Sequence, residues 1–252
     1  MRNRLKETLR QGKVALGITL SIGHPDVAEA LSGISLDYIN FDTQHTPLSI
    51  DTVQSMMQAL SNSESTPIVR VMANDLAMIN RALDIGAHGV IVPFVNTKED
   101  AVKAVRNATF PPRGIRSWGP RRAAMHDPDY ERTTDDEILV IPQIETKEAV
   151  DNIDSILTVD GIEVFFVGPH DLSWTLGIHG QWNNPKFEEA IGKVLDAAKR
   201  YDVTPGMLAL TEAAEKTIER GFRLVNLGGD VAFMTEGVRS ALVRARKAKP
   251  KS

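Results

Sequence analysis

The chain has 252 residues, 42% of them hydrophobic and 25% charged, and its formal net charge is −4. This is an ordinary globular composition. It lacks the basic excess of a nucleic-acid-binding surface and any apolar run near the roughly 20 residues of a membrane span, so we expect neither nucleic acid nor a membrane as partner. There is no cysteine, which excludes disulfides and thiolate zinc sites, and the first residues lack the apolar core of a signal peptide. We therefore expect a cytoplasmic protein.

Short apolar runs and amphipathic stretches alternate along the chain. The predicted strands are residues 14–22, 38–45, 66–71, 89–95, 138–145, 162–171, 204–210 and 222–230. The predicted helices are residues 25–33, 49–60, 75–86, 97–109, 146–157, 186–201, 211–221 and 231–247. Residues 110–137, which follow the fourth of these helices, are predicted to be irregular.

Eight strand–helix units in a chain of this length match a (β/α)8 TIM barrel. Strands that are apolar almost throughout also suit a parallel sheet covered on both faces. We predict one TIM-barrel domain over residues 1–252, with a doubly wound open sheet as the alternative. A dinucleotide-binding fold is disfavoured, because no Gly-x-Gly-x-x-Gly motif follows the first predicted strand.

Polar residues gather at the ends of the predicted strands. Catalytic groups of TIM barrels come from the carboxyl ends of the strands, which here carry Asp42, Gln44, His45, Arg70, Gln143, Glu145, Gly168, His170, Asp171 and Gly228-Gly229-Asp230. Taken singly, each has a structural interpretation: Asp42 could cap a turn, and Glu145 or Asp171 could begin a helix. Their recurrence at one edge of one predicted barrel favours a catalytic site.

Glu145 and Asp171 come from neighbouring predicted strands. Such strands lie about 4.8 Å apart, so both carboxylates can converge on one ion. Two carboxylates, with water and substrate as the remaining ligands, are a common way to hold Mg²⁺ or Mn²⁺. No predicted strand contains a lysine, since Lys13 precedes the first strand and Lys147 follows the fifth. Schiff-base catalysis, which needs a desolvated lysine, is therefore disfavoured.

Four segments resemble, in chain order, the metal-dependent (class II) pyruvate aldolases of the phosphoenolpyruvate/pyruvate TIM-barrel superfamily. They are "FDTQHTP", "PIVR", "PQIET" and "VGPHDLS", and the resemblance runs from about residue 10 to residue 245. The family includes 4-hydroxy-2-oxoheptanedioate (2,4-dihydroxyhept-2-ene-1,7-dioate) aldolase and 2-dehydro-3-deoxyglucarate aldolase. The resemblance implies cleavage and formation of 4-hydroxy-2-oxo acids, with pyruvate and an aldehyde as the small-molecule partners and a metal-stabilised pyruvate enolate as the intermediate.

The resemblance also implies a role for each matching residue. His45 matches the general base, Arg70 the residue that stabilises the enolate, and Asp84 an acid that raises the basicity of the histidine. By its helical pattern alone, Asp84 is predicted to be an exposed helix residue. Glu145 and Asp171 match the ligands of a divalent metal ion, Mg²⁺ or Mn²⁺ with Co²⁺ as a further candidate. The substrate-binding positions match four residues: Gln143, Gly168, His170 and Asp171.

The chain departs from the family pattern at a few positions. Gln44 stands where a glutamate is usual, Thr19 where some members have tryptophan, and His170 where a small residue is usual, and the segment around Trp118 also differs. We expect these residues to shape the aldehyde side of the site. The resemblance further implies a hexamer, built as a trimer of dimers, in which the last helix is swapped between subunits.

Three other functions remain open from the residues alone. One is a carbon–carbon lyase of the citrate-lyase-β or malyl-coenzyme A type, which would need a coenzyme A site that the sequence does not display. Another is a sugar-phosphate isomerase or epimerase that uses Gly228-Gly229 as a phosphate cradle. The third is a barrel that binds or scaffolds without catalysis.

Overall fold

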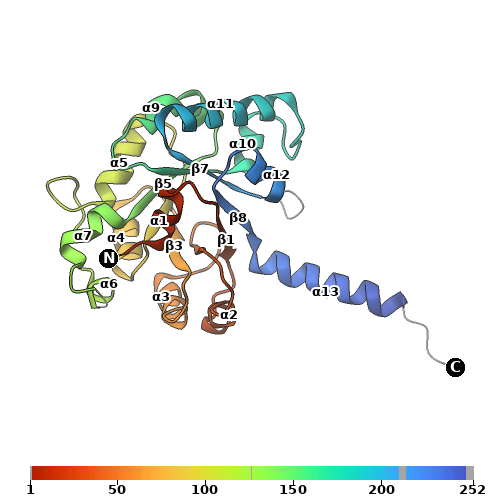
Figure 1. The fold of residues 1–252 in the computed structure, drawn as a ribbon, viewed down its shortest axis with the longest axis horizontal. Coiled ribbons are helices and arrows are strands. Elements are labelled where there is room, and N and C mark those ends of the chain that lie inside the picture. The colour runs from red at the N-terminus through yellow and green to blue at the C-terminus, as the bar shows by residue number, and fades with distance from the viewer. Residues whose placement is uncertain (1, 126, 210–213, 248–252) are drawn as a thin grey trace.

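The computed structural model describes residues 2–125, 127–209 and 214–247 (Figure 1). Eight parallel strands pair in chain order and close into a barrel through β1 and β8. The strands are β1 (Ala15–Leu20), β2 (Tyr38–Asp42), β3 (Thr66–Arg70), β4 (Gly89–Val92), β5 (Leu139–Ile144), β6 (Val164–Val167), β7 (Thr204–Leu208) and β8 (Leu224–Gly229). The predicted (β/α)8 TIM barrel is confirmed.

Helices surround this barrel in the order expected for a TIM barrel (Figure 1). They are α1 (Arg4–Arg10), α2 (Pro25–Leu31), α3 (Ile50–Ala59), α4 (Leu76–Asp84), α5 (Lys98–Ala108), α6 (Arg121–Met125), α7 (Tyr130–Glu137), α8 (Lys147–Asp151), α9 (Ile153–Leu157), α10 (Pro169–Thr175), α11 (Pro185–Tyr201), α12 (Ala214–Glu219) and α13 (Asp230–Lys247). The ends of the predicted seventh strand and helix, residues 210–213, lie outside the described residues.

Two apolar layers stabilise the barrel. The larger layer lies between the strands and the surrounding helices. The smaller layer fills the barrel itself and includes Tyr38, Ile68 and Phe166 together with Leu5 and Leu9 of α1. The α1 helix was not predicted from the sequence, and its two buried leucines cover the amino-terminal end of the barrel. The opposite end, where the strands finish, is left for polar groups.

Local signals account for several helix starts. Asp75 caps α4 by accepting hydrogen bonds from the backbone N–H groups of Ala77 and Met78. Thr97 and Asp100 form a capping box at the start of α5. Ser49 stands at the N-cap position of α3, but its side chain bonds the hydroxyl of Thr52 instead of a helix N–H.

The predicted strand 162–171 is wrong in its second half. The strand β6 stops at Val167, and helix α10 begins at Pro169, a residue that favours the first position of a helix because its φ is already helical and it has no N–H to leave unpaired. His170 and Asp171 therefore belong to the first turn of a helix and not to a strand end. The predicted irregular segment 110–137 likewise contains α6 and α7.

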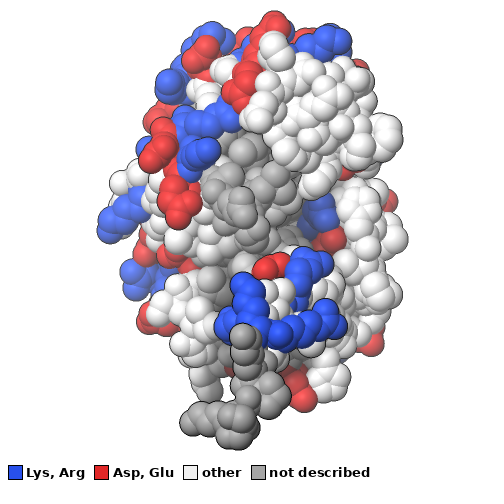
Figure 2. Space-filling model, turned by 90° about the vertical axis from the view of Figure 1, so that its right-hand side faces the viewer, with Lys and Arg blue, Asp and Glu red and all other residues white. Residues whose placement is uncertain are grey.

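The last helix, α13, extends away from the barrel (Figure 1), and basic side chains gather at its end, which faces the viewer in Figure 2. Its apolar side chains are exposed, namely Val231, Phe233, Met234, Val238, Leu242 and Val243. In the described part of the chain, no helix combines the length and the apolar character that a membrane crossing requires.

Candidate active site

Asp42 and Arg70 are the last residues of neighbouring strands and face each other in register. The Arg70 guanidinium donates from Nε to Asp42 Oδ1 at 2.9 Å and from Nη2 to Oδ2 at 2.7 Å. Burial of Asp42 opposes its ionisation, but this paired guanidinium and two backbone N–H donors hold the pKa of Asp42 below its usual value. Arg70 is thus a fixed cation at the carboxyl end of the barrel, which we call the rim.

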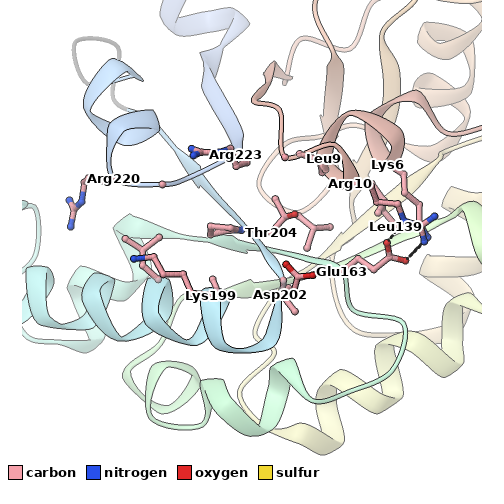
Figure 3. Close-up of a pocket in the computed structure, with 17 residues that line it drawn as sticks. Lys6, Leu9, Arg10, Leu139, Glu163, Lys199, Asp202, Thr204, Arg220 and Arg223 are labelled. Atoms are coloured by element: carbon pink, nitrogen blue, oxygen red, sulfur yellow. Dashed lines mark hydrogen bonds and ion pairs between the residues drawn. The ribbon is translucent and has the colours of Figure 1, made fainter.

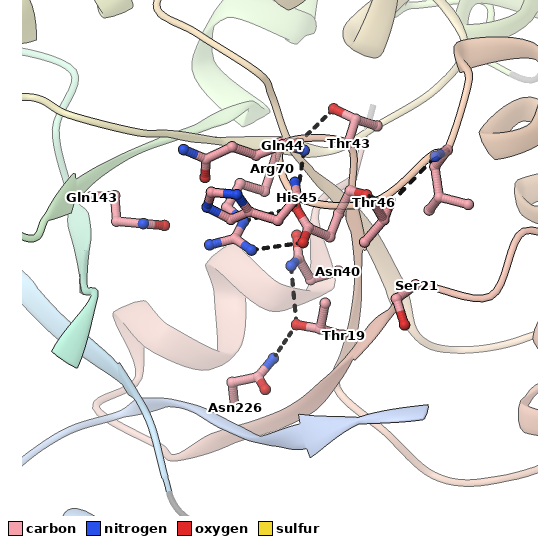
Figure 4. A network of polar contacts seen from close by, with 12 residues as sticks. Thr19, Ser21, Asn40, Thr43, Gln44, His45, Thr46, Arg70, Gln143 and Asn226 are labelled. Carbon is pink, nitrogen blue, oxygen red and sulfur yellow. Dashed lines mark hydrogen bonds and ion pairs between the residues drawn. The ribbon is translucent and has the colours of Figure 1, made fainter. Parts of the chain in front are cut away.

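The same carboxylate shapes the loop that carries His45. Asp42 Oδ1 accepts hydrogen bonds from the backbone N–H groups of Gln44 at 3.0 Å and of His45 at 3.4 Å. The Thr46 hydroxyl donates to the Asp42 carbonyl. The imidazole of His45 is exposed and lies close to Arg70 at the rim (Figure 4). Asp42 therefore orients both the predicted base and the predicted cation.

Glu145 follows β5 and is completely buried. Its Oε1 accepts the backbone N–H of Phe94 at 2.8 Å, and its Oε2 accepts the side-chain amide of Gln143. Phe94 donates from a left-handed backbone with a φ of 52°, a costly conformation for a residue with a side chain. Burial raises the pKa of Glu145, and the nearby charge of Asp171 raises it further, whereas Arg70 opposes that rise. Glu145, Asp171 and Arg70 thus share one electrostatic environment.

Gly168 lies directly against this carboxylate. A Cβ atom at position 168 would stand 2.8 Å from the Cβ of Glu145 and 2.9 Å from its Oε2, so only glycine fits. The next residues form the first turn of α10, where an acid such as Asp171 is stabilised by the helix dipole. The His170 ring is turned edge-on to Trp182, with 5.1 Å between ring centroids.

Asp84 does not lie at the rim of its own barrel. It is the last residue of α4, a helix that starts beyond the end of β3 and runs back along the barrel, away from the rim. Its Oδ1 accepts from Nη2 of Arg116 at 2.8 Å, and the same nitrogen donates to the Tyr130 hydroxyl at 3.0 Å. Arg116 is fully buried. The structure therefore brings His45, Arg70, Gln143, Glu145, Gly168 and Asp171 to the rim, but it does not bring Asp84 there.

A polar group around Thr19 lies below His45 on the side of β8, β1 and β2, and it includes two asparagines that were not predicted from the sequence. The Thr19 hydroxyl oxygen accepts the side-chain amides of Asn40 at 3.1 Å and Asn226 at 3.0 Å (Figure 4). The signal was present in the sequence, because each asparagine interrupts an otherwise apolar strand, "YINFD" and "LVNLGG". Both are buried, and buried polar side chains inside a barrel usually serve a site or a network.

The rim offers oxygen ligands for a metal ion. Within the described ranges, no group of three or more histidine, cysteine, aspartate and glutamate side chains is arranged to hold one. Glu145 and Asp171 supply two carboxylates, and Oε1 of Gln143 is buried without a hydrogen-bond partner. Such hard oxygen donors, completed by water and substrate, suit Mg²⁺ or Mn²⁺. The residues therefore fit the predicted divalent cation.

A hollow of about 520 Å³ lies at the other end of the barrel (Figure 3). Val164 and Thr204, the first residues of β6 and β7, line it. Glu163 there pairs with Lys6 at 2.8 Å and with Arg10 at 2.7 Å. None of the residues predicted to carry out chemistry lines this hollow, and the functional faces of TIM barrels are their carboxyl-terminal ones. We therefore assign the candidate active site to the rim.

Comparison with known proteins agrees with this geometry. A family model described as HpcH/HpaI aldolase/citrate lyase matches residues 17–236. The 4-hydroxy-2-oxo-heptane-1,7-dioate aldolase of Salmonella dublin is 34% identical over 249 residues, which are 97% of this chain and 95% of the relative. A solved HpcH/HpaI aldolase/citrate lyase family protein from Burkholderia cenocepacia superposes with a TM-score of 0.93 at 35% identity, over 97% of this chain and 100% of that one. An HpcH/HpaI aldolase from Desulfitobacterium hafniense gives 0.91 at 31%, covering 98% of each chain.

The match extends over nearly the whole chain and includes all eight strands of the barrel. The resemblance to metal-dependent aldolases seen in the sequence is thereby confirmed, as is the prediction of a carbon–carbon lyase. The chain belongs to the HpcH/HpaI aldolase/citrate lyase family.

Proposed function

We propose that this protein catalyses the reversible cleavage of 4-hydroxy-2-oxo acids into pyruvate and an aldehyde. The observation that carries this proposal is the fully buried Glu145, which shares its electrostatic environment with Asp171 and Arg70. His45 is held beside that group by the Asp42 carboxylate. The Salmonella dublin relative is named for an aldolase reaction on a substrate of this type, which supports the same chemistry here.

Glu145 and Asp171 would hold the divalent ion, Mg²⁺ or Mn²⁺ with Co²⁺ as a further candidate. When bound, the cation supplies a Lewis acid that stabilises negative charge developing on the substrate. Gln143, through the amide that bonds Glu145, would keep the ligand carboxylate in place, and its free Oε1 would accept a hydrogen bond from a ligand or water. Because burial raises the pKa of Glu145 and a ligand carboxylate must be ionised, metal affinity is expected to fall as the pH falls.

The rim residues would divide the remaining work. In cleavage, His45 takes the proton of the substrate 4-hydroxyl, the C3–C4 bond breaks, and the aldehyde leaves. The electron pair of that bond stays on the pyruvate part as an enolate, whose charge the fixed guanidinium of Arg70 stabilises. Protonation at C3 then gives pyruvate. Beside the metal ligands, four residues would bind the pyruvate part: Gln143, Gly168, His170 and Asp171.

We propose a homo-oligomer, a hexamer by resemblance, in which α13 packs on a neighbouring copy. The exposed apolar side chains of α13 support this, because a contiguous apolar surface favours burial against another chain. The position of Asp84 supports it as well. For Asp84 to act on a His45, as the resemblance implies, the two residues would have to come from different subunits. A cytoplasmic location stays a proposal that rests on the cysteine-free composition.

The test is a retro-aldol assay on a panel of 4-hydroxy-2-oxo acids, with pyruvate release as the readout. We expect cleavage that stops with EDTA and returns on addition of Mg²⁺, Mn²⁺ or Co²⁺. Malyl-coenzyme A and citrate serve as competing substrates. Cleavage of these alone would favour the citrate-lyase type of reaction, which the family also includes.

A further inference from the structure

The hydroxyl of Thr19 has one unused hydrogen-bonding function. A hydroxyl offers two acceptor lone pairs and one O–H donor. Both acceptor positions of Thr19 are occupied, by the amides of Asn40 and Asn226. Its O–H therefore remains available as a donor. Thr19 is partly exposed, so this donor can reach a ligand at the rim.

One amide oxygen on the same side also lacks a partner. Oδ1 of Asn40 is buried and accepts no hydrogen bond within the described structure. Asn40 is only 4% exposed, and its amide nitrogen is already committed to Thr19, which fixes the oxygen as the free end. Buried acceptors without partners are uncommon, and each one points to an O–H or N–H group that the structure lacks. We refer to Thr19, Asn40 and Asn226 as the Thr19 cluster.

The Thr19 cluster contains no charge that would favour a carboxylate. The strands β8, β1 and β2 carry no lysine or arginine. Arg70, on the adjacent strand, is already bound by both oxygens of Asp42. Asp230, which directly follows β8, accepts the backbone N–H groups of Ser21 and Ile22 and the Ser21 hydroxyl. A ligand carboxylate would therefore meet amide oxygens and a fixed negative charge.

The cluster also lies where the second half of the substrate must extend. In a closed ring of eight strands, β1 stands opposite β5, which carries Gln143 and precedes Glu145. Figure 4 shows His45 and Arg70 between Gln143 and the Thr19 cluster. A substrate whose pyruvate part is held at Glu145 thus passes His45 and directs its aldehyde part toward Thr19. Gly229, the register partner of Thr19 on β8, places no side chain beside it.

We propose that the Thr19 cluster binds hydroxyl groups of the aldehyde, so that the preferred partner of pyruvate is a hydroxylated aldehyde and not one that ends in a carboxylate. This inference rests on the proposed function and names the class of its second substrate. A substrate hydroxyl there can donate to Oδ1 of Asn40 and accept from the O–H of Thr19. A ligand without hydroxyls leaves the Asn40 acceptor unpaired. We expect this to weaken binding of that ligand by about tenfold to a hundredfold.

The test measures kcat/KM for aldol addition of pyruvate to three aldehydes with the same metal: glyceraldehyde, propanal and succinate semialdehyde. Glyceraldehyde and propanal have equal chain length and differ only in their hydroxyls. We expect kcat/KM for glyceraldehyde to exceed that for propanal by at least about tenfold, and to exceed that for succinate semialdehyde. Equal values, or preference for the carboxylate-terminated aldehyde, would overturn the inference.

Variants of Thr19 test whether its hydroxyl causes the preference for glyceraldehyde over propanal. Thr19→Val keeps the shape and removes the hydroxyl, and should reduce the glyceraldehyde-to-propanal ratio by about tenfold, whereas Thr19→Ser should retain it. Thr158→Val is the matched control, because the Thr158 hydroxyl is exposed and bonds only the Ser155 carbonyl of its own helix. An unchanged ratio in Thr19→Val would contradict the assignment.

Deuterium exchange into the methyl group of pyruvate, which needs no aldehyde, separates the two proposals. Absence of exchange in the wild-type protein with metal would overturn the proposed function and this inference with it. Exchange together with equal kcat/KM for the three aldehydes would overturn the hydroxyl preference alone.

Discussion

At the scale of single residues, Glu145 is a predicted metal ligand that lowers the stability of the metal-free protein. Its pKa is raised by burial and then by Asp171, so the folded chain holds the Glu145 proton more tightly than the unfolded chain does. Such a group favours folding while it is protonated, and that contribution is lost as the pH rises through the folded pKa. At neutral pH without metal, Glu145 with its raised pKa is therefore destabilising.

Replacing this carboxylate with an amide gives the first prediction. Glu145→Gln should unfold in EDTA at pH 7 at a temperature equal to or above that of the wild-type protein, and this advantage should vanish near pH 4. Metal-dependent cleavage should fall by more than the about 10- to 100-fold typical of residues that only support a ligand. Thermal unfolding at the two pH values, with cleavage assays beside it, checks both. A variant that is clearly less stable at pH 7 would refute the account of Glu145.

His45 provides the second prediction at this scale. Its side chain is exposed and only its backbone N–H takes part in the turn that Asp42 organises, so truncation should leave the fold intact. A positioned base contributes about 10²–10⁴-fold, and we expect His45→Ala to lose kcat of that order with an unchanged circular dichroism spectrum. Retention of the full cleavage rate would show that another group takes the proton.

At the scale of elements, Gly168 links β6 to the ligand carboxylate. Gly168→Ala would place its Cβ 2.8 Å from the Cβ of Glu145, so the local backbone must shift. We expect a loss of about 1–3 kcal/mol in the free energy of unfolding, together with weaker metal binding.

Gly192 is the matched control for this glycine substitution. A Cβ there meets nothing within 4 Å, and the residue lies inside α11, so Gly192→Ala should stabilise by about 0.5–1 kcal/mol. Urea unfolding of both variants tests the contrast. Equal effects of the two substitutions would mean that the close approach at Gly168 carries no cost.

Among the elements, the strands are where prediction from the sequence succeeded. All eight strands were found, because each is an apolar run separated from the next by a helical pattern. The error at residues 162–171 arose because Pro169 follows an apolar run directly, so the strand was extended through the start of α10. The rim position of Arg70 and Glu145 followed from the strand ends. The bonds of Asn40 to Thr19 could not be predicted, because they join residues of different strands.

At the scale of the whole molecule, α13 is a long helix that its own chain leaves largely uncovered, since Asp230 is its one buried residue. Phe233, Val238 and Leu242 on it are 42%, 57% and 48% exposed. If these side chains pack on a neighbouring copy, Phe233→Glu combined with Val238→Glu should lower the molar mass measured by light scattering. Lys103→Glu, a charge change on the exposed face of α5, should leave the mass unchanged. A wild-type protein that is monomeric at micromolar concentration would refute the proposed oligomer.

The predicted catalytic role of Asp84 depends on the proposed oligomer. Its ion pair with the buried Arg116 holds the carboxylate in one place, far along α4 from the rim of its own barrel. A function for Asp84 in catalysis therefore depends on a neighbouring copy.

The single-domain assignment over residues 1–252 stays a prediction.

We propose that the rim, with a divalent ion, stabilises the enolate of pyruvate. The most direct measurement is the exchange of pyruvate methyl protons for deuterium in D₂O, followed by mass spectrometry without any aldehyde present. We predict exchange in the wild-type protein with Mg²⁺, Mn²⁺ or Co²⁺, no exchange in EDTA, and none in Glu145→Gln. Exchange that continues undiminished in EDTA, or its absence with all three metals, would contradict the account.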